Sequence, residues 1–132
     1  MKDIKDRADI ELLVNEFYKL VIKDDQIGFF FTEIISLDFD KHLPVMYDFW
    51  ETTLLGNRKY HGNPMVKHIL LNEKATMTSK HFERWLDLWE QTLSSNFRGP
   101  TTSEALYRAK QIAEIMKLKI GITPGKQGNQ AE

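Results

Sequence analysis

The stretch GNPMVKHILL, residues 62–71, places one histidine, His68, inside a short apolar run. Asn63 and Pro64 form a helix-start signal, because asparagine is a preferred N-cap and proline fits the first helical position. The pattern therefore predicts a short helix that ends near Leu71. An aliphatic side chain would pack more safely at position 68, so the imidazole is either a hydrogen-bonded core residue or a ligand for a bound group.

The chain of 132 residues is long enough for one domain with a single sizeable core. Its 18 basic and 19 acidic residues give a net charge of −1, so we expect no nucleic acid and no membrane as partner. The absence of cysteine excludes disulfides and thiolate metal sites. Neither a signal peptide nor a membrane-length apolar run is visible, so the sequence predicts a cytoplasmic domain.

Apolar residues recur at helical spacing in further segments that glycine and proline separate. The predicted helices span residues 7–23, 40–55 and 79–97, with a last helix from Thr101 to a stop at Gly121. The T-x-x-E pattern of Thr101 and Glu104 predicts a capping box at the start of that last helix. Pro44 is compatible with the second helix only if it lies in the first turn.

No segment alternates with the period of a half-buried strand, so we predict an all-α fold. The final segment, ITPGKQGNQAE, is polar and contains two glycines and a proline. We therefore expect one domain over residues 1–120 and a disordered tail over residues 121–132.

Four predicted helices each carry one hydrogen-bonding ring on their apolar side, namely Tyr18, His42, His68 and Trp85. Phenol, imidazole and indole groups need partners when they are buried, so their convergence would create a polar site inside an apolar pocket. The competing interpretation is that each ring is a satisfied core residue, or that the Tyr18 hydroxyl reaches the surface.

Other kinds of site find less support in the sequence. Carboxylates do not pair on an apolar stripe, serines do not form a nucleophile elbow, and no glycine-rich loop could hold phosphate. His61 and His81 are expected to face solvent, as are the basic side chains of Arg58, Lys59 and Lys67. A bound cofactor is therefore the best supported source of chemistry.

The segment FWETTLLGNRKYHGNPMVKH, residues 49–68, resembles the signature of the truncated haemoglobins, in particular the third group of that family. HFERWLDLW at residues 81–89 and EFYKLV at residues 16–21 match two further family segments, and the likeness covers residues 9–118. The resemblance implies a two-over-two helical sandwich around one haem b, a shortened relative of the globin fold.

The resemblance also implies roles for single residues. His68 falls on the proximal histidine, the one protein ligand of the iron, which leaves the sixth position open. Tyr18 and Trp85 match distal hydrogen-bond donors, and His42 matches a distal histidine that in this group can swing between pocket and solvent. Further expected haem contacts are Phe31, Phe49, Trp50, Tyr60 and Lys67, with Arg58 and Lys59 as other candidates for the propionates.

The sequence departs from the family pattern at one position on the distal side. Pro44 lies two residues after His42 and leaves open whether that ring points into the pocket or outward. Tyr18 and Trp85 belong to other helices, so the departure does not reach them.

The resemblance implies a haem protein that binds oxygen, and with it nitric oxide and carbon monoxide, at a five-coordinate iron. Two donors in a small pocket favour retention of the ligand, so simple oxygen transport fits less well. A redox enzyme acting on nitric oxide or peroxide is the alternative, and it needs a separate reductase because the chain has no flavin or nicotinamide domain. A haem-free helical interaction module is the third class, and it predicts a colourless protein.

Overall fold

The computed structural model describes residues 1–31, 39–57, 77–119 and 121. Its helices are α1 (Arg7–Lys23), α2 (Phe39–Leu55), α4 (Ser79–Asn96) and α5 (Pro100–Lys119), and no strand occurs in these ranges. The predicted all-α fold is confirmed, and the four helix ranges agree closely with the predicted ones. The predicted short helix around His68 and the tail from residue 122 lie outside the described residues.

Helix α1 forms where its sequence predicts it. The carboxylate of Asp6 accepts a hydrogen bond from the amide of Asp9 at 3.0 Å and caps the first turn. The apolar side chains that follow at helical spacing are buried, and they are Ile10, Leu13, Val14, Phe17 and Val21. The helix ends at Lys23, and the amide of Asp24 donates to the carbonyl of Val21 at 3.0 Å.

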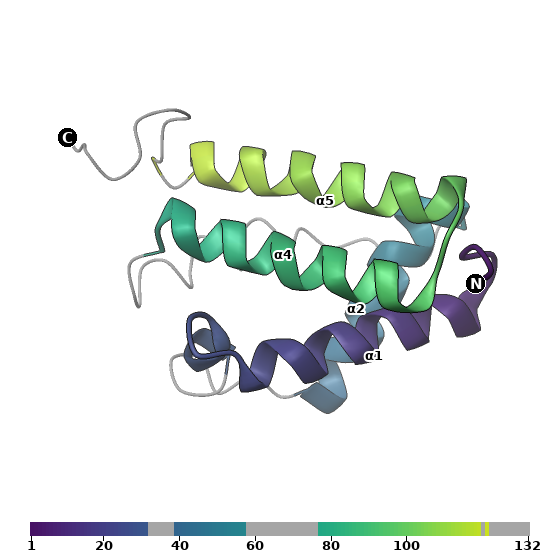
Figure 1. Cartoon of the computed structure of the whole chain (residues 1–132), viewed down its shortest axis with the longest axis horizontal. Helices are drawn as coiled ribbons and strands as arrows, with labels where there is room; N and C mark the ends of the chain where they lie inside the picture. The colour runs from purple at the N-terminus through teal and green to yellow at the C-terminus, as the bar shows by residue number, and fades with distance from the viewer. Residues whose placement is uncertain (32–38, 58–76, 120, 122–132) are drawn as a thin grey trace.

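The four helices form two pairs. Helix α1 packs on α2, and α4 packs antiparallel on α5, while α1 also packs against α4 and so joins the pairs (Figure 1). The buried face of α5 carries small residues, Ala105, Ala109 and Ala113, which allow α4 to approach closely. This arrangement is the predicted two-over-two sandwich.

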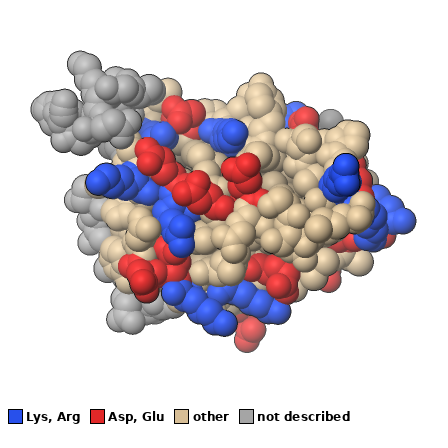
Figure 2. Space-filling model, viewed as in Figure 1, with Lys and Arg blue, Asp and Glu red and all other residues tan. Residues whose placement is uncertain are grey.

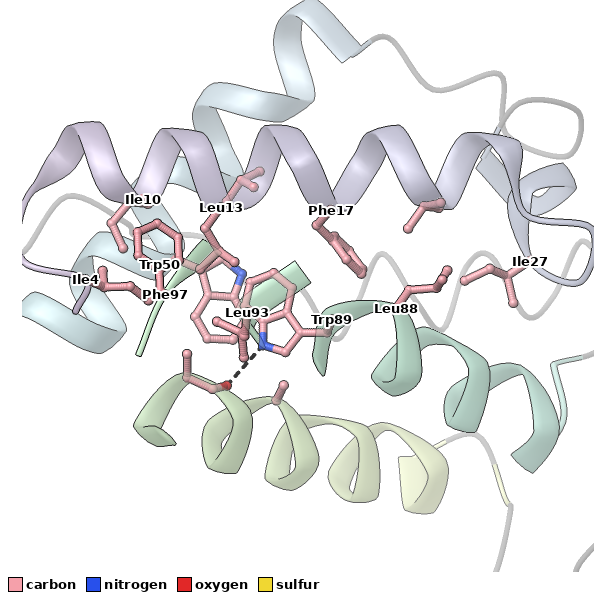
Figure 3. Close-up of a cluster of buried hydrophobic side chains, with 14 of the residues drawn as sticks. Ile4, Ile10, Leu13, Phe17, Ile27, Trp50, Leu88, Trp89, Leu93 and Phe97 are labelled. Atoms are coloured by element: carbon pink, nitrogen blue, oxygen red, sulfur yellow. Dashed lines mark hydrogen bonds between the residues drawn. The ribbon is translucent and has the colours of Figure 1, made fainter. Parts of the chain in front are cut away.

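The core lies between α1, α4 and α5, as Figure 3 shows. Trp89 stands near its centre with 1% of its surface exposed. Its indole N–H donates to the backbone carbonyl of Ala105 at 3.2 Å, so burial leaves this donor satisfied. The bond also fixes the position of α4 along α5.

The start of α5 differs from the predicted capping box. The helix begins at Pro100, before Thr101, and its first amides are capped by a residue from the other end of the chain. The carboxylate of Asp3 accepts from the amide of Thr101 at 2.9 Å and from the amide and hydroxyl of Thr102 at 2.8 and 2.7 Å. The prediction was wrong because a remote carboxylate occupies the donors that a local cap would use. Glu104 pairs with Arg108 instead.

Gly99 makes this contact possible. Its φ of 145° suits glycine, and a Cβ atom there would come within 2.5 Å of Cγ of Asp3. The amide of Arg98 donates to the carbonyl of Lys2 at 2.9 Å and extends the same attachment. Figure 1 shows the N-terminus beside the connection between α4 and α5.

Helix α2 also corrects a prediction. It begins at Phe39, so Pro44 lies beyond the first turn, where it lacks the N–H that would reach the carbonyl of Asp40. The helix nevertheless continues to Leu55, because tertiary contacts hold the part after the proline. Arg7 of α1 donates to Asp48 and to the buried Glu51, each at 2.7 Å.

Charged side chains of both signs are interspersed on the face shown in Figure 2. Ion pairs along α5 contribute to this pattern, for example Lys117 with Glu114 at 2.8 Å. None of the described helices combines the length and the apolar character that crossing a membrane requires.

Candidate functional site

Two of the predicted polar rings meet between α1 and α2. The hydroxyl oxygen of Tyr18 lies 2.8 Å from Nε2 of His42, a hydrogen bond, and the two rings pack edge to face with centroids 5.3 Å apart. His42 therefore points inward, and Pro44 does not turn it to the outside. The reason is that the first turn of α2 is already helical when the proline is reached, so His42 keeps its place on the inner face.

Trp85 of α4 faces the same region. Together with Tyr18 it lines a cavity of about 40 Å³, enough for a molecule of a few atoms. The other lining side chains are almost all apolar, and they are Val14, Phe17, Met46, Phe49, Trp50, Trp89, Ile112 and Met116. One phenol and three indoles thus stand in the wall of an otherwise apolar space, and the N–H of Trp89 is already bonded to the carbonyl of Ala105.

The electrostatics of the cavity keep Tyr18 neutral. Burial raises the pKa of the Tyr18 phenol above its usual range, so the hydroxyl retains its proton at neutral pH. When Nε2 of His42 carries a proton, the imidazole donates to the Tyr18 oxygen, and the phenol O–H then remains available for a further acceptor. Trp85 adds an indole N–H that makes no hydrogen bond to a described residue.

The three apolar residues that we expected at the site occupy different depths. Phe31 is buried and lies edge-on to Tyr18 with ring centroids 6.0 Å apart. Phe49 is half-buried in the cavity wall and packs on Trp50 at 5.2 Å. Trp50 reaches deeper, because its ring also stacks on Trp89 of the core at 4.6 Å.

The remaining predicted site residues lie outside the described residues. They are the expected iron ligand His68, the expected propionate contacts Tyr60 and Lys67, and the further candidates Arg58 and Lys59. Their roles stay predictions. Within the described ranges, no group of three or more histidine, aspartate or glutamate side chains could hold a metal ion.

A second cavity adjoins the first and shares Trp85 and Met116 with it. Its other lining residues are Ile27, Phe30, Phe31, Met77, His81 and Phe82. The segment that supplies three of these follows α1 and is positioned by Asp24, which accepts from the amide of Ile27 at 3.0 Å and pairs with Arg84 of α4 at 2.7 Å. Burial alone would raise the pKa of Asp24, but these hydrogen bonds outweigh it and lower that pKa.

His81 is a residue that the sequence prediction misplaced. It is partly buried, its ring packs on Phe30 with centroids 4.8 Å apart, and its Nδ1 accepts the amide N–H of Thr78 at 2.9 Å. Burial also lowers the pKa of His81. The available signal was Thr78, which stands three residues earlier and makes His81 part of a helix cap. Met116 was not among the predicted site residues, since periodicity does not tell a core position from a cavity wall.

Comparisons with known proteins place this geometry in context. The chain matches the model of a family described as bacterial-like globins over residues 3–118. It is 31% identical over 110 residues to a group 3 truncated haemoglobin of Campylobacter jejuni. The aligned residues cover 81% of this chain and 84% of that relative. Its fold is similar to the crystal structure of a group III truncated haemoglobin from Campylobacter jejuni, with a TM-score of 0.79 and 28% identity over 91% of this chain and 95% of that one.

Proposed function

The chain belongs to the bacterial-like globins and, within them, to the group III truncated haemoglobins, and on this premise we propose that it binds haem b and a diatomic gas. The observation that carries the proposal is that Tyr18, which lines an apolar cavity together with Trp85, is hydrogen-bonded to His42 at 2.8 Å. Burying polar rings costs free energy that their hydrogen bond offsets only in part, so apolar side chains would serve a purely structural core better.

The residues present fit haem chemically. A porphyrin is flat and apolar, and the side chains of Phe31, Phe49 and Met46 offer apolar surface beside the polar rings. His68 is the proposed iron ligand, and Tyr60 and Lys67 are the proposed partners of the propionates. Haem, when bound, supplies an iron that shifts electron density onto a diatomic ligand.

The protein's contribution is the placement of donors around that ligand. The Tyr18 hydroxyl and the Trp85 indole N–H donate to the partial negative charge on the ligand, and His42 orients the phenol. A hydrogen bond to a charged acceptor contributes about 1.5–3 kcal/mol, which slows ligand escape roughly ten- to a hundredfold for each donor. Oxygen, which becomes strongly polarised, gains more from these donors than carbon monoxide does.

The same donors favour retention of oxygen, so we propose binding or sensing rather than delivery. Redox turnover of nitric oxide or peroxide is the second candidate, because Tyr18, His42 and Trp85 can also supply or orient protons at a polarised ligand. That candidate requires electrons from a separate reductase. Steady turnover once a chemical reductant is added would distinguish it from reversible binding.

The first experiment is a titration of the purified chain with hemin, followed by absorption spectra of the ferric, ferrous and carbon-monoxide forms. We expect one haem per chain and a stable oxygenated ferrous spectrum. His68→Ala should lower haem affinity by at least about a hundredfold, since even the outer partners of metal ligands contribute ten- to a hundredfold.

His61→Ala is the matched control, because it removes an imidazole from the same segment at a position that we predict to face solvent. It should bind haem as the unmodified chain does. A colourless protein whose spectrum does not change on addition of hemin contradicts the proposal, and so does equal haem affinity for the His68→Ala and His61→Ala variants.

A further inference from the structure

Helix α5 has two faces with different surroundings. Its inner face packs on α4 and places Ile112 and Met116 in the wall of the cavity of about 40 Å³. Its outer face lies at the edge of the four helices, with α4 between it and α1 (Figure 1). Three large apolar side chains of α5 are nevertheless exposed, with accessible fractions of 57% for Tyr107, 40% for Ile115 and 59% for Leu118. The described helices leave this apolar surface uncovered.

The exposed side chains of α5 are spaced for contact with another helix. One ridge along the outside of the helix consists of residues at intervals of three and four, namely Tyr107, Gln111, Glu114 and Leu118. The first three of these, with Lys110 and Ile115, line an open hollow of about 410 Å³. The amide group of Gln111 donates to the hydroxyl of Tyr107 at 3.0 Å and orients that ring beside the hollow. The outer face thus combines apolar side chains toward both ends with a recess between them.

The charges of this outer face complement a second copy of the same face. In an antiparallel pair of α5 helices, related by a two-fold axis that passes beside Ile112, Lys110 of each copy lies opposite Glu114 of the other. Tyr107 and Leu118 come opposite each other with an offset of one residue, which is about 1.5 Å along a helix and within the reach of a side chain. One register therefore joins opposite charges and brings apolar side chains together.

The lysines of the outer face can accept this arrangement. Within the described part of the chain, neither Lys110 nor Lys119 forms an ion pair. Glu114 already pairs with Lys117 at 2.8 Å, but a carboxylate has acceptor sites for a second cation. In the same register Lys119 comes within one residue of Glu104 of the other copy, so a second kind of opposite-charge pair forms.

A parallel pair of α5 helices would have the reverse electrostatics. It would place Lys110 against Lys110 and Glu114 against Glu114, and such like-charge contacts repel. We propose that the outer face of α5 binds a second copy of this chain, forming an antiparallel dimer with two-fold symmetry. The cavity lies on the inner side of α5, so the dimer leaves it uncovered, and the proposal does not depend on the proposed haem site.

The size of the contact sets its strength. A helix of this length is about 30 Å long and 10 Å wide, so one helix pair covers less than the roughly 800 Å² per partner of a standard interface. The dimer is therefore weak and depends on protein concentration, with a Kd on the order of 100 μM. Added salt should weaken it, because exposed ion pairs are screened.

The test is sedimentation velocity of the full chain over a range of concentrations at low salt. The unmodified chain should shift from monomer to dimer as its concentration rises. Leu118→Ala should raise the Kd roughly tenfold, since each copy loses apolar contact area. Its thermal unfolding should hardly change, because this leucine is largely exposed in the monomer.

Two charge variants test the register. Lys110→Glu puts carboxylates on both sides of each central contact, and Glu114→Lys puts ammonium groups there, so each variant alone should associate at least about tenfold more weakly. An equal mixture of the two restores opposite charges at both contacts and should associate about as the unmodified chain does. Lys80→Glu is the control, because it makes the same charge change on an exposed lysine of α4, and it should leave the dimer unchanged.

Three outcomes overturn the proposal. They are an unmodified chain that stays monomeric well above the expected Kd, charge variants that associate alone as strongly as the unmodified chain, and a mixture that associates no better than its components. Thermal unfolding of each variant checks that it is folded. Absorption spectra with hemin, recorded on the same samples, test the proposed function separately, because a monomeric chain can still bind haem.

Discussion

Phe17 and Tyr18 are neighbours in the sequence and both line the cavity of about 40 Å³, yet the two side chains differ in burial and in the contacts that they make. Phe17 is almost fully buried and packs on Trp89, whereas Tyr18 is half-buried and hydrogen-bonded to His42. Apolar burial is non-directional and stabilises any well-packed core, while a hydrogen bond acts only along one direction. We infer that the core side of α1 sets stability, and that the Tyr18 side sets the chemistry of the site.

The largest expected effect tests the core side with two adjacent leucines. Leu13 has 0% of its surface exposed and Leu12 has 43%. Leu13→Ala should lower the free energy of unfolding by about 2–5 kcal/mol, because it removes buried methyl groups and leaves a cavity. Leu12→Ala should change it by less than about 0.5 kcal/mol. Urea unfolding measures both, and equal losses would contradict the division between the two sides.

The second prediction tests the Tyr18 side. Tyr18→Phe keeps the ring but removes the donor, so oxygen should leave the ferrous protein about ten- to a hundredfold faster, corresponding to about 1.5–3 kcal/mol. Stopped-flow or flash-photolysis kinetics give the rate. Tyr47→Phe is the control, because Tyr47 donates its hydroxyl hydrogen to Asn15 and does not line the cavity of about 40 Å³. Unchanged release in Tyr18→Phe would remove the donor role.

The third prediction concerns a directional bond that serves stability alone. Asp3→Ala should lower the free energy of unfolding by about 0.5–2 kcal/mol at neutral pH, since the first amides of α5 lose their cap. Burial opposes ionisation of Asp3, but hydrogen bonds from Thr101, Thr102 and Ile4 outweigh it and lower the pKa of Asp3 to about 2.

The lowered pKa sets the sign of the pH dependence. The carboxylate of Asp3 stabilises the folded chain above the unfolded pKa of 3.8, and this contribution is lost as the pH falls toward 2. The difference between the unmodified chain and Asp3→Ala should therefore shrink over that interval in chemical denaturation. Oxygen release should be the same in both proteins, and a change would link the cap to the site.

The smallest expected effect concerns the pH dependence of oxygen release, which we expect to be flat above neutral pH. Burial raises the pKa of Tyr18, so its hydroxyl stays protonated while the pH rises from neutrality to about 10, the usual pKa of tyrosine. The rate of oxygen release should be constant over that range. Above it the unfolded chain ionises first, so stability should fall. A step in the release rate below pH 10 would mean that Tyr18 titrates like an exposed phenol.

Sequence periodicity predicted the helices because each one buries a regular apolar stripe. The range of α1 was correct at both ends, since Asp6 and Asp24 mark them locally. The predicted start of α5 was wrong, because the residue that caps this helix, Asp3, stands 98 positions before Thr101. A local pattern such as T-x-x-E cannot reveal a competitor that reaches the helix only after the chain has folded.

The candidate site also contains features that the sequence predicts and features that depend on the tertiary fold. Tyr18 and Trp85 line one cavity, because helical spacing fixes the face on which a residue lies, and their roles toward a ligand stay predictions. The inward direction of His42 could not be read past Pro44, since it depends on where α2 begins. The second cavity, with His81 and Met116, follows from how three elements meet and has no signature along the chain.

The clasp between Asp3 and the start of α5 also bears on how quickly the protein gains and loses its structure. Its partners are separated by nearly the whole domain, so closing that loop costs considerable chain entropy and is expected only after the rest has assembled. A contact that is absent from the folding transition state leaves the folding rate almost unchanged and slows unfolding instead. We therefore expect the clasp to act as a latch, lengthening the lifetime of the native state without hastening its formation.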